Sequence, residues 1–92
     1  MPPLSATEVA SHLSTLPAWK LEAGELVREF QFEDFLTAMR FVNQVAELAE
    51  KAGHHPDIDI RYNRVRLGLV THSDGGLTSK DFDLAAGINK LG

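Results

Sequence analysis

Hydrophobic residues recur at intervals of three and four in three segments of this chain, the spacing that places them on one face of a helix. Each segment opens on a residue that can cap a helix, which predicts a helix over about residues 6–15, a long one between Asp34 and Gly53, and a last one after Thr78. Ser5 with Glu8 and Thr78 with Asp81 have the spacing of a capping box. The expected buried positions are Val9, Leu13 and Leu16 in the first helix, Phe35, Ala38, Met39, Val42, Val45, Ala46 and Ala49 in the second, and Phe82, Ala85 and Ala86 in the third.

Hydrophobic and polar residues alternate in four further segments, as they do in strands with one buried face. Residues 19–22 and 25–32 are separated by Ala23-Gly24, so they predict a hairpin with a two-residue turn. Residues 57–62 and 65–72 flank Asn63-Arg64 and predict a second hairpin. The inner rows are expected to hold Leu26, Phe30 and Phe32 in the second segment and Val65, Leu67, Leu69 and Thr71 in the fourth.

The order α-β-β-α-β-β-α predicts an α+β fold with two layers, a four-stranded antiparallel sheet carrying three helices on one face. The 92 residues show no internal linker or repeat, so we expect a single domain over residues 1–92. On the opposite face of the sheet, Val27 and Val70 are more apolar than a solvated surface requires. A homodimer or homotetramer is therefore expected.

The composition argues against several classes of function. Nine basic residues against 13 acidic ones give a net charge of -4 without a basic stripe, which argues against direct nucleic-acid binding. The absence of cysteine removes disulfides, thiolate nucleophiles and cysteine zinc sites, and it fits a cytoplasmic protein. No apolar run has transmembrane length, and the first residues lack the pattern of a secretory signal. We therefore expect a cytoplasmic protein without membrane contact.

Three of the four histidines lie within the 19 residues from His54 to His72. Pro56 forces His55 out of helical geometry, so the pair His54-His55 must lie between the second helix and the third strand. His72 is expected to close the fourth strand, which a hairpin returns to the same end of the sheet. Because imidazole can give and take a proton near neutral pH, convergence of the three rings predicts a site of proton transfer.

Each of these residues also has a purely structural interpretation. His54 could only complement the dipole of the preceding helix, His55 could satisfy a turn, and His72 could point outward from a strand. Asp81 occupies a capping position that also borders the loop after His72, so it could serve both purposes. The fourth histidine, His12, is expected on the surface of the first helix.

Three other side chains near this pattern have weaker signals. Glu50 lies one turn before His54 and is expected to be solvated or paired with a histidine. Tyr62 is expected to pack with its hydroxyl bonded, and Trp19 to lie in the core or at an interface, or to stack on a planar ligand. A zinc site that adds aspartates to the imidazoles is the less favoured alternative, because adjacent histidines in an extended chain point apart.

The pattern Glu50-x3-His54-His55-Pro56-x5-Tyr62-x9-His72-x8-Asp81 resembles the signature of the pterin-4a-carbinolamine dehydratases. The resemblance runs from Trp19 through Phe30, Phe32, Phe35 and Phe41 to Gly76-Leu77, nearly the whole chain. It implies an antiparallel sheet with helices on one face. It also implies an enzyme that eliminates water from 4a-hydroxytetrahydropterin to give the quinonoid dihydropterin, without metal or redox cofactor.

The same resemblance implies roles for individual residues. His54 and His55 would transfer protons, and His72 would bind or polarise the pterin and share the acid role. Asp81 would orient a histidine, and Trp19, Glu50 and Pro56 would border or orient the site. The division of acid and base steps stays open, as do the physiological pterin and the pathway. The alternative is a non-catalytic pterin-binding or protein-partner module, such as a dimerisation cofactor, on the same fold.

Overall fold

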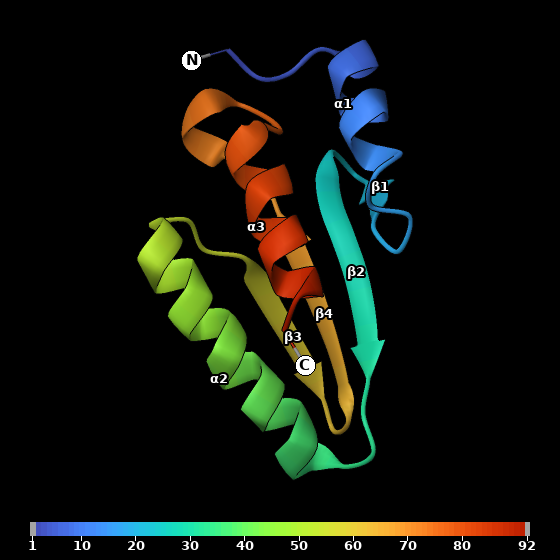
Figure 1. Cartoon of the computed structure of the whole chain (residues 1–92), viewed down its shortest axis with the longest axis vertical. Helices are drawn as coiled ribbons and strands as arrows, with labels where there is room; N and C mark the ends of the chain where they lie inside the picture. Colours follow the sequence, from blue (N-terminus) through green and yellow to red (C-terminus); the bar gives the residue numbers. More distant parts are fainter. Residues whose placement is uncertain (1, 92) are drawn as a thin grey trace.

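The chain forms one antiparallel sheet of four strands, combined with three α-helices, in the predicted order α-β-β-α-β-β-α (Figure 1). The computed structural model describes residues 2–91. The elements are α1 (Ala6–Leu13), β1 (Lys20–Glu22), β2 (Glu25–Gln31), α2 (Phe35–Ala52), β3 (Asp57–Arg61), β4 (Arg64–Leu69) and α3 (Ser79–Asn89), with a short 3-10 helix (His72–Asp74) before α3. The strands are ordered β1-β2-β4-β3, so the strands of the two hairpins that meet, β2 and β4, are the central ones. The predicted fold class is confirmed.

Both hairpins have two-residue turns, but the second turn differs from the prediction by one residue. Arg61 pairs with Arg64, so the turn is Tyr62-Asn63 and not Asn63-Arg64. Asn63 takes this place because it is fixed to the end of β2, where its side-chain Nδ2 donates to the carbonyl of Phe32 over 2.8 Å. Tyr62 is left in the left-handed region with φ 51° and is 66% exposed, so the expectation that it packs is wrong.

The fourth strand ends earlier than the alternating pattern predicts. β4 stops at Leu69, and Thr71 forms an isolated bridge with Gly76 that closes a small loop. Within this loop His72 begins the 3-10 helix, and Gly75 has φ 78°, a conformation that suits glycine. His72 therefore lies in a turn just beyond the sheet and not in the strand itself.

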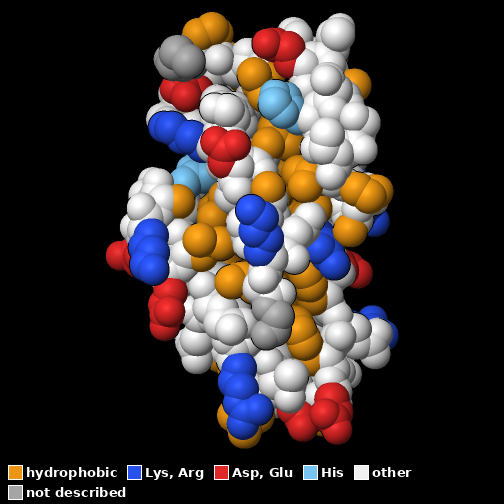
Figure 2. Space-filling model, in the orientation of Figure 1, with side chains coloured by type: hydrophobic (Ala, Val, Ile, Leu, Met, Phe, Trp, Pro, Cys, Tyr) orange, Lys and Arg blue, Asp and Glu red, His pale blue; other side chains and the backbone are white. Residues whose placement is uncertain are grey.

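The core lies between the sheet and the helices α2 and α3. The predicted inner row of β4 and Leu26 of β2 are fully buried, and burial of each such side chain contributes about 1.5–3 kcal/mol. The buried residues of α2 are Ala38, Phe41, Val42, Val45 and Ala49, whereas Phe35 and Ala46 are exposed against expectation. The buried face includes Phe41 because its ring packs on Phe30 and Phe32, with centroids 4.6 and 5.0 Å away. Figure 2 shows the helical face, where hydrophobic side chains run between the charged ones.

The opposite face of the sheet carries mainly charged side chains, among them Arg66 paired with Glu22 and Glu29. Val27 on this face is already buried within one copy of the chain. The Glu25 side chain lies across Gly68, the direct partner of Val27, within 2.7 Å of where a Cβ of residue 68 would stand. Val27 therefore gives no reason to expect a second copy on this face.

The first turn of α2 depends on the carboxylate of Asp34, which accepts a hydrogen bond from the Thr37 amide over 2.8 Å. This bond lowers the pKa of Asp34 below its ordinary value of 3.8. A lowered native pKa means that the ionised cap stabilises the fold above about pH 3.8 and that this contribution is lost as the pH falls through the native pKa.

None of the helices within residues 2–91 is long and apolar enough to cross a membrane.

Because the Asp34 carboxylate caps α2, we expect Asp34→Ala to lower the thermal midpoint at pH 7. Asp34→Asn should retain most of the midpoint, because Asn caps helices nearly as well. The parent chain should lose stability relative to the Asn variant as the pH falls below about 3.8. Circular-dichroism melts of the three chains at pH 7 and pH 3 measure both effects. A difference between parent and Asn variant that does not change with pH contradicts the assignment.

Candidate active site

The end of α2, the start of β3, the end of β4 and the start of α3 meet at one end of the sheet. Gly53 ends α2 in the left-handed conformation with φ 63°, which turns the chain toward β3. The amide of His54 donates back to the carbonyl of Ala49 over 3.2 Å, so the backbone of the first histidine is fixed to the helix. His55 and Pro56 then lead into β3.

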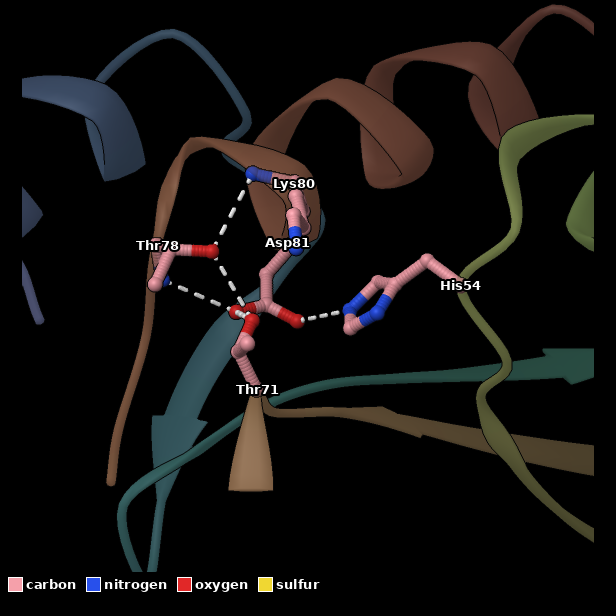
Figure 3. Close-up of polar contacts among 5 residues, drawn as sticks. All are labelled: His54, Thr71, Thr78, Lys80 and Asp81. Atoms are coloured by element: carbon pink, nitrogen blue, oxygen red, sulfur yellow. Dashed lines mark hydrogen bonds and ion pairs between the residues drawn. The ribbon is translucent and has the colours of Figure 1, made fainter. Parts of the chain in front are cut away.

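His54 and Asp81 form the central contact of this region (Figure 3). Nε2 of His54 lies 2.6 Å from Oδ1 of Asp81, although the two residues are 27 positions apart. Asp81 is fully buried and the His54 side chain is 12% exposed. Because solvent barely reaches the contact, this hydrogen bond holds the imidazole more firmly than a surface pair would.

Two threonines complete the surroundings of the buried carboxylate. Oδ2 of Asp81 accepts hydrogen bonds from the Thr71 hydroxyl over 2.8 Å and from the Thr78 amide over 2.9 Å. The capping box predicted for Thr78 and Asp81 is present, since the carboxylate bonds the cap residue's amide in return. The carboxylate thus has three hydrogen-bonding neighbours, which offset the cost of removing it from water.

Glu50 and His55 form a second pair on the surface beside the first. Nε2 of His55 contacts Oε2 of Glu50, and both side chains are mostly exposed. An exposed pair of this kind contributes only about 0–1 kcal/mol, so its effect is on the direction of the ring more than on stability. The structure therefore assigns a separate carboxylate partner to each of the two adjacent histidines.

His72 approaches the same region through its neighbour in the chain. Thr71 binds the carboxylate that holds His54, so the backbone immediately before His72 is fixed to Asp81. The His72 side chain is exposed, and no hydrogen bond joins it to another side chain within residues 2–91. His72 is thus the one histidine of the three without a carboxylate partner among the described residues.

The structure does not bring Trp19 to this end of the sheet. Trp19 is 2% exposed, and its Nε1 donates over 2.7 Å to Oδ1 of Asn89, in the last turn of α3. Asp81 is in the first turn of that helix, about 12 Å away along the axis. Trp19 thus packs in the core at the far end of α3. His12 is on the surface of α1 as expected, with its ring stacked on Phe82 at 5.0 Å.

Thr71 and Thr78 were not singled out as site residues by the sequence, although both bond the carboxylate of Asp81. One signal was present. Thr71 continues the apolar row Val65, Leu67, Leu69, so it was a polar side chain at a buried position. A buried hydroxyl needs a hydrogen-bond partner, and for Thr71 that partner is Asp81.

Hollows in the surface differ in their relation to the histidines. A small one of about 210 Å³ borders His54 and is lined by Leu48, Ala52, His54, Lys80, Asp83, Leu84 and Gly87. A larger one of about 790 Å³ lies on the charged face of the sheet around Arg64 and Arg66, and none of the three histidines lines it. Of these two hollows, only the smaller one borders one of the three histidines. Within residues 2–91 no group of three or more potential ligands is arranged to hold a metal ion.

Comparison with known proteins gives one consistent result. Residues 2–91 match the family described as pterin 4 alpha carbinolamine dehydratase. A relative from Acidobacterium capsulatum is 64% identical over 99% of both chains, and one from Chloroflexus aurantiacus is 59% identical over 99% of this chain and 98% of its own. Both are named, provisionally, as pterin-4-alpha-carbinolamine dehydratases.

Solved structures agree with the sequence relatives. The crystal structure of a transcriptional coactivator/pterin dehydratase from Brucella melitensis has a TM-score of 0.90 and 38% identity, with 95% of each chain covered. A pterin dehydratase-like protein identified as a RuBisCO assembly factor in the alpha-carboxysome has a TM-score of 0.66 over 78% of this chain and 86% of its own. At 23% identity, the latter similarity shows the fold alone. The chain therefore belongs to the pterin-4-alpha-carbinolamine dehydratase family.

Proposed function

We propose that this chain is a dehydratase that eliminates water from 4a-hydroxytetrahydropterin to give the quinonoid dihydropterin by histidine acid and base catalysis. The observation that carries the proposal is the contact between the buried Asp81 carboxylate and Nε2 of His54. Two more histidines are chain neighbours of residues that bond Asp81: His55 follows His54, and His72 follows Thr71. Family membership supplies the substrate class.

The reaction needs two proton transfers and no electron transfer. The bond between carbon 4a and its hydroxyl oxygen breaks, and a general acid protonates the departing oxygen so that water leaves. A general base takes the proton from nitrogen 5, and the electrons left there form the double bond to carbon 4a. Imidazoles suit both steps because they change protonation state near neutral pH.

Some of these residues transfer protons, and others hold the proton-transferring side chains in place. We assign proton transfer to His54 and His55, and binding or polarisation of the pterin, with a share in the acid step, to His72. Asp81 orients His54, and Glu50 orients His55. Pro56 keeps the histidine pair out of helical geometry, so its role is to shape the backbone.

The test is turnover of chemically generated 4a-hydroxytetrahydropterin, followed by the absorbance of the quinonoid product and compared with the spontaneous rate. We expect a rate above the spontaneous one that a chelator does not reduce, in a sample without stoichiometric zinc. Zinc that is present and whose removal abolishes the rate supports a metal enzyme instead. A chain that binds a pterin analogue without exceeding the spontaneous rate supports the non-catalytic binding module.

We further propose that the chain assembles into a homodimer or homotetramer. β3 is an edge strand whose five residues are all exposed, and Ile58 and Ile60 on it, with Tyr62 at its end, present apolar surface to solvent. An edge of this kind is normally covered or blunted with charge, and a second copy can cover it.

Residues 1–92 would act as one domain in the cytoplasm, consistent with a chain that has no internal linker and no cysteine.

For a homodimer or homotetramer, sedimentation should give two or four times 10.1 kDa. The substitution Ile60→Lys, which places a charge on the edge strand, should shift the chain toward the monomer without loss of its circular-dichroism spectrum. Leu21→Lys is the matched control, since Leu21 is similarly exposed on the opposite edge strand, β1. A parent chain that sediments at 10.1 kDa contradicts the proposed assembly.

A further inference from the structure

We infer that Thr71 and Thr78 are positioning residues that keep a proton on Nε2 of His54 and leave its Nδ1 as the nitrogen that accepts the substrate proton. This inference rests on the proposed function and extends it to the protonation state of one ring. It is carried by the hydrogen-bond network around Asp81, which is shown in Figure 3.

The hydroxyl hydrogens of Thr71 and Thr78 have one acceptor each. Thr71 lies 2.8 Å from Oδ2 of Asp81 and 2.8 Å from the hydroxyl of Thr78. A threonine hydroxyl has one hydrogen, and the carboxylate can only accept. Thr71 therefore donates to Asp81, and Thr78 must donate to Thr71. The Thr78 oxygen in turn accepts from the amide of Lys80 over 3.3 Å, so each hydroxyl hydrogen is used once.

The carboxylate of Asp81 has two fixed neighbours at one of its oxygens. Oδ2 of Asp81 already accepts from the Thr71 hydroxyl and the Thr78 amide, and the latter is a donor that cannot reverse its role. Thr71, Thr78 and Asp81 are all buried, so water does not compete for these positions. With two donors at Oδ2, the carboxylate faces His54 with its other oxygen, Oδ1, which accepts as well.

The imidazole of His54 is the donor in its contact with Asp81. The 2.6 Å contact to Oδ1 needs a donor, and the only candidate is the N–H on Nε2 of His54. A neutral ring protonated on Nε2 has its lone pair on Nδ1. No hydrogen bond ties Nδ1 to any other residue of the described part of the chain, and no buried side-chain nitrogen there lacks a partner, so Nδ1 is reached by solvent.

The arrangement suits the base step of the dehydration. Nδ1 accepts the proton from nitrogen 5 of the pterin while the hydroxyl leaves carbon 4a as water, with a proton supplied by a second histidine. His54 is then an imidazolium with a proton on both nitrogens. The Asp81 carboxylate compensates this positive charge across 2.6 Å, and it gives up no hydrogen bond to do so.

Two variants of Thr71 separate a positioning role from a structural one. Thr71→Val keeps the shape and removes the hydroxyl, whereas Thr71→Ser keeps the hydroxyl. The direct readout is the pair of imidazole ¹⁵N chemical shifts of His54, which report the tautomer whether or not the protein turns over substrate. The second readout is kcat and KM for the dehydration.

We expect the parent and the Ser variant to show His54 protonated on Nε2 in the neutral form. Without the Thr71 hydroxyl only the Thr78 amide fixes Oδ2 of Asp81, so the carboxylate can turn away from Nε2 of His54. The Val variant should therefore show a mixture of both tautomers, and its kcat should fall about 10- to 100-fold with KM nearly unchanged, the range found when the hydrogen-bond partner of a metal-bound histidine is removed. The unchanged KM is expected because Thr71 is buried. Recovery of kcat in the Ser variant supports the role of the hydroxyl.

Two outcomes overturn the inference. One is a parent spectrum in which neutral His54 carries its proton on Nδ1, a result that needs no variant and does not depend on folding of the Val chain. The other is a folded Val variant with the tautomer and kcat of the parent. A parent chain without dehydratase activity would refute the proposed function and leave the tautomer assignment to be decided by the spectrum.

Discussion

His55→Ala should lower kcat for dehydration by about 100- to 10,000-fold, the usual contribution of one positioned acid or base. His54→Ala should cause a loss of the same order, because the proposal assigns proton transfer to both rings. His55 is the cleaner position, since it is exposed and its only side-chain hydrogen bond within residues 2–91 is to Glu50, so its removal should leave the thermal midpoint nearly unchanged. The measurement is turnover of chemically generated 4a-hydroxytetrahydropterin.

The matched control for this series is His12→Ala. His12 is also exposed, but its ring stacks on Phe82 at 5.0 Å, and among the described residues no hydrogen bond or ion pair joins it to Glu50 or Asp81. Its substitution should leave kcat unchanged, which separates the loss of a particular imidazole from the loss of any histidine. Parent-like rates in the chains altered at His54 and at His55 would refute the assignment of proton transfer to this pair.

Asp81→Asn should lower kcat by about 1,000- to 10,000-fold, because it reverses the hydrogen bond to His54. The two donors at Oδ2, Thr71 and the Thr78 amide, require an oxygen there, so the new NH₂ group must face Nε2. Nε2 then has to accept, and the proton moves to Nδ1, the nitrogen proposed to act as the base. Shape and volume are almost unchanged, so the loss is one of protonation state.

Asp81→Leu provides the contrast for this substitution. It removes the acceptor from three buried groups and should destabilise the fold by about 3–5 kcal/mol, measured by urea denaturation. The Asn variant should lose much less stability, so that its low kcat cannot be attributed to unfolding. An Asn variant with parental kcat, or one in which ¹⁵N shifts still place the proton on Nε2, would show that Asp81 does not set the tautomer.

Local patterns in the sequence predicted the elements well wherever neighbouring residues decide the outcome. The capping box of Thr78 and Asp81 requires only residues three positions apart, and it forms as expected. The predictions that were wrong depend on contacts between distant segments. Phe41 is buried in place of Phe35 because it meets the rings of Phe30 and Phe32, and the second turn begins at Tyr62 because Asn63 bonds Phe32.

The candidate site shows the same limit. That His54, His55 and His72 approach one end of the sheet follows from hairpin geometry and from the proline after the pair. The sequence indicated that Glu50 could pair with a histidine and that Asp81 could orient one, but not that Asp81 meets His54 and Glu50 meets His55. Which carboxylate each of the two adjacent histidines meets depends on the direction in which Gly53 turns the backbone out of α2.

The double use of Asp81 links chemistry to the local stability of α3. Its carboxylate closes the first turn of the helix through Thr78 and also holds the imidazole of His54. Helix ends fray at a lower free-energy cost than that of global unfolding. Opening of this one turn would release the ring, so on heating the proposed activity should be lost before the sheet melts.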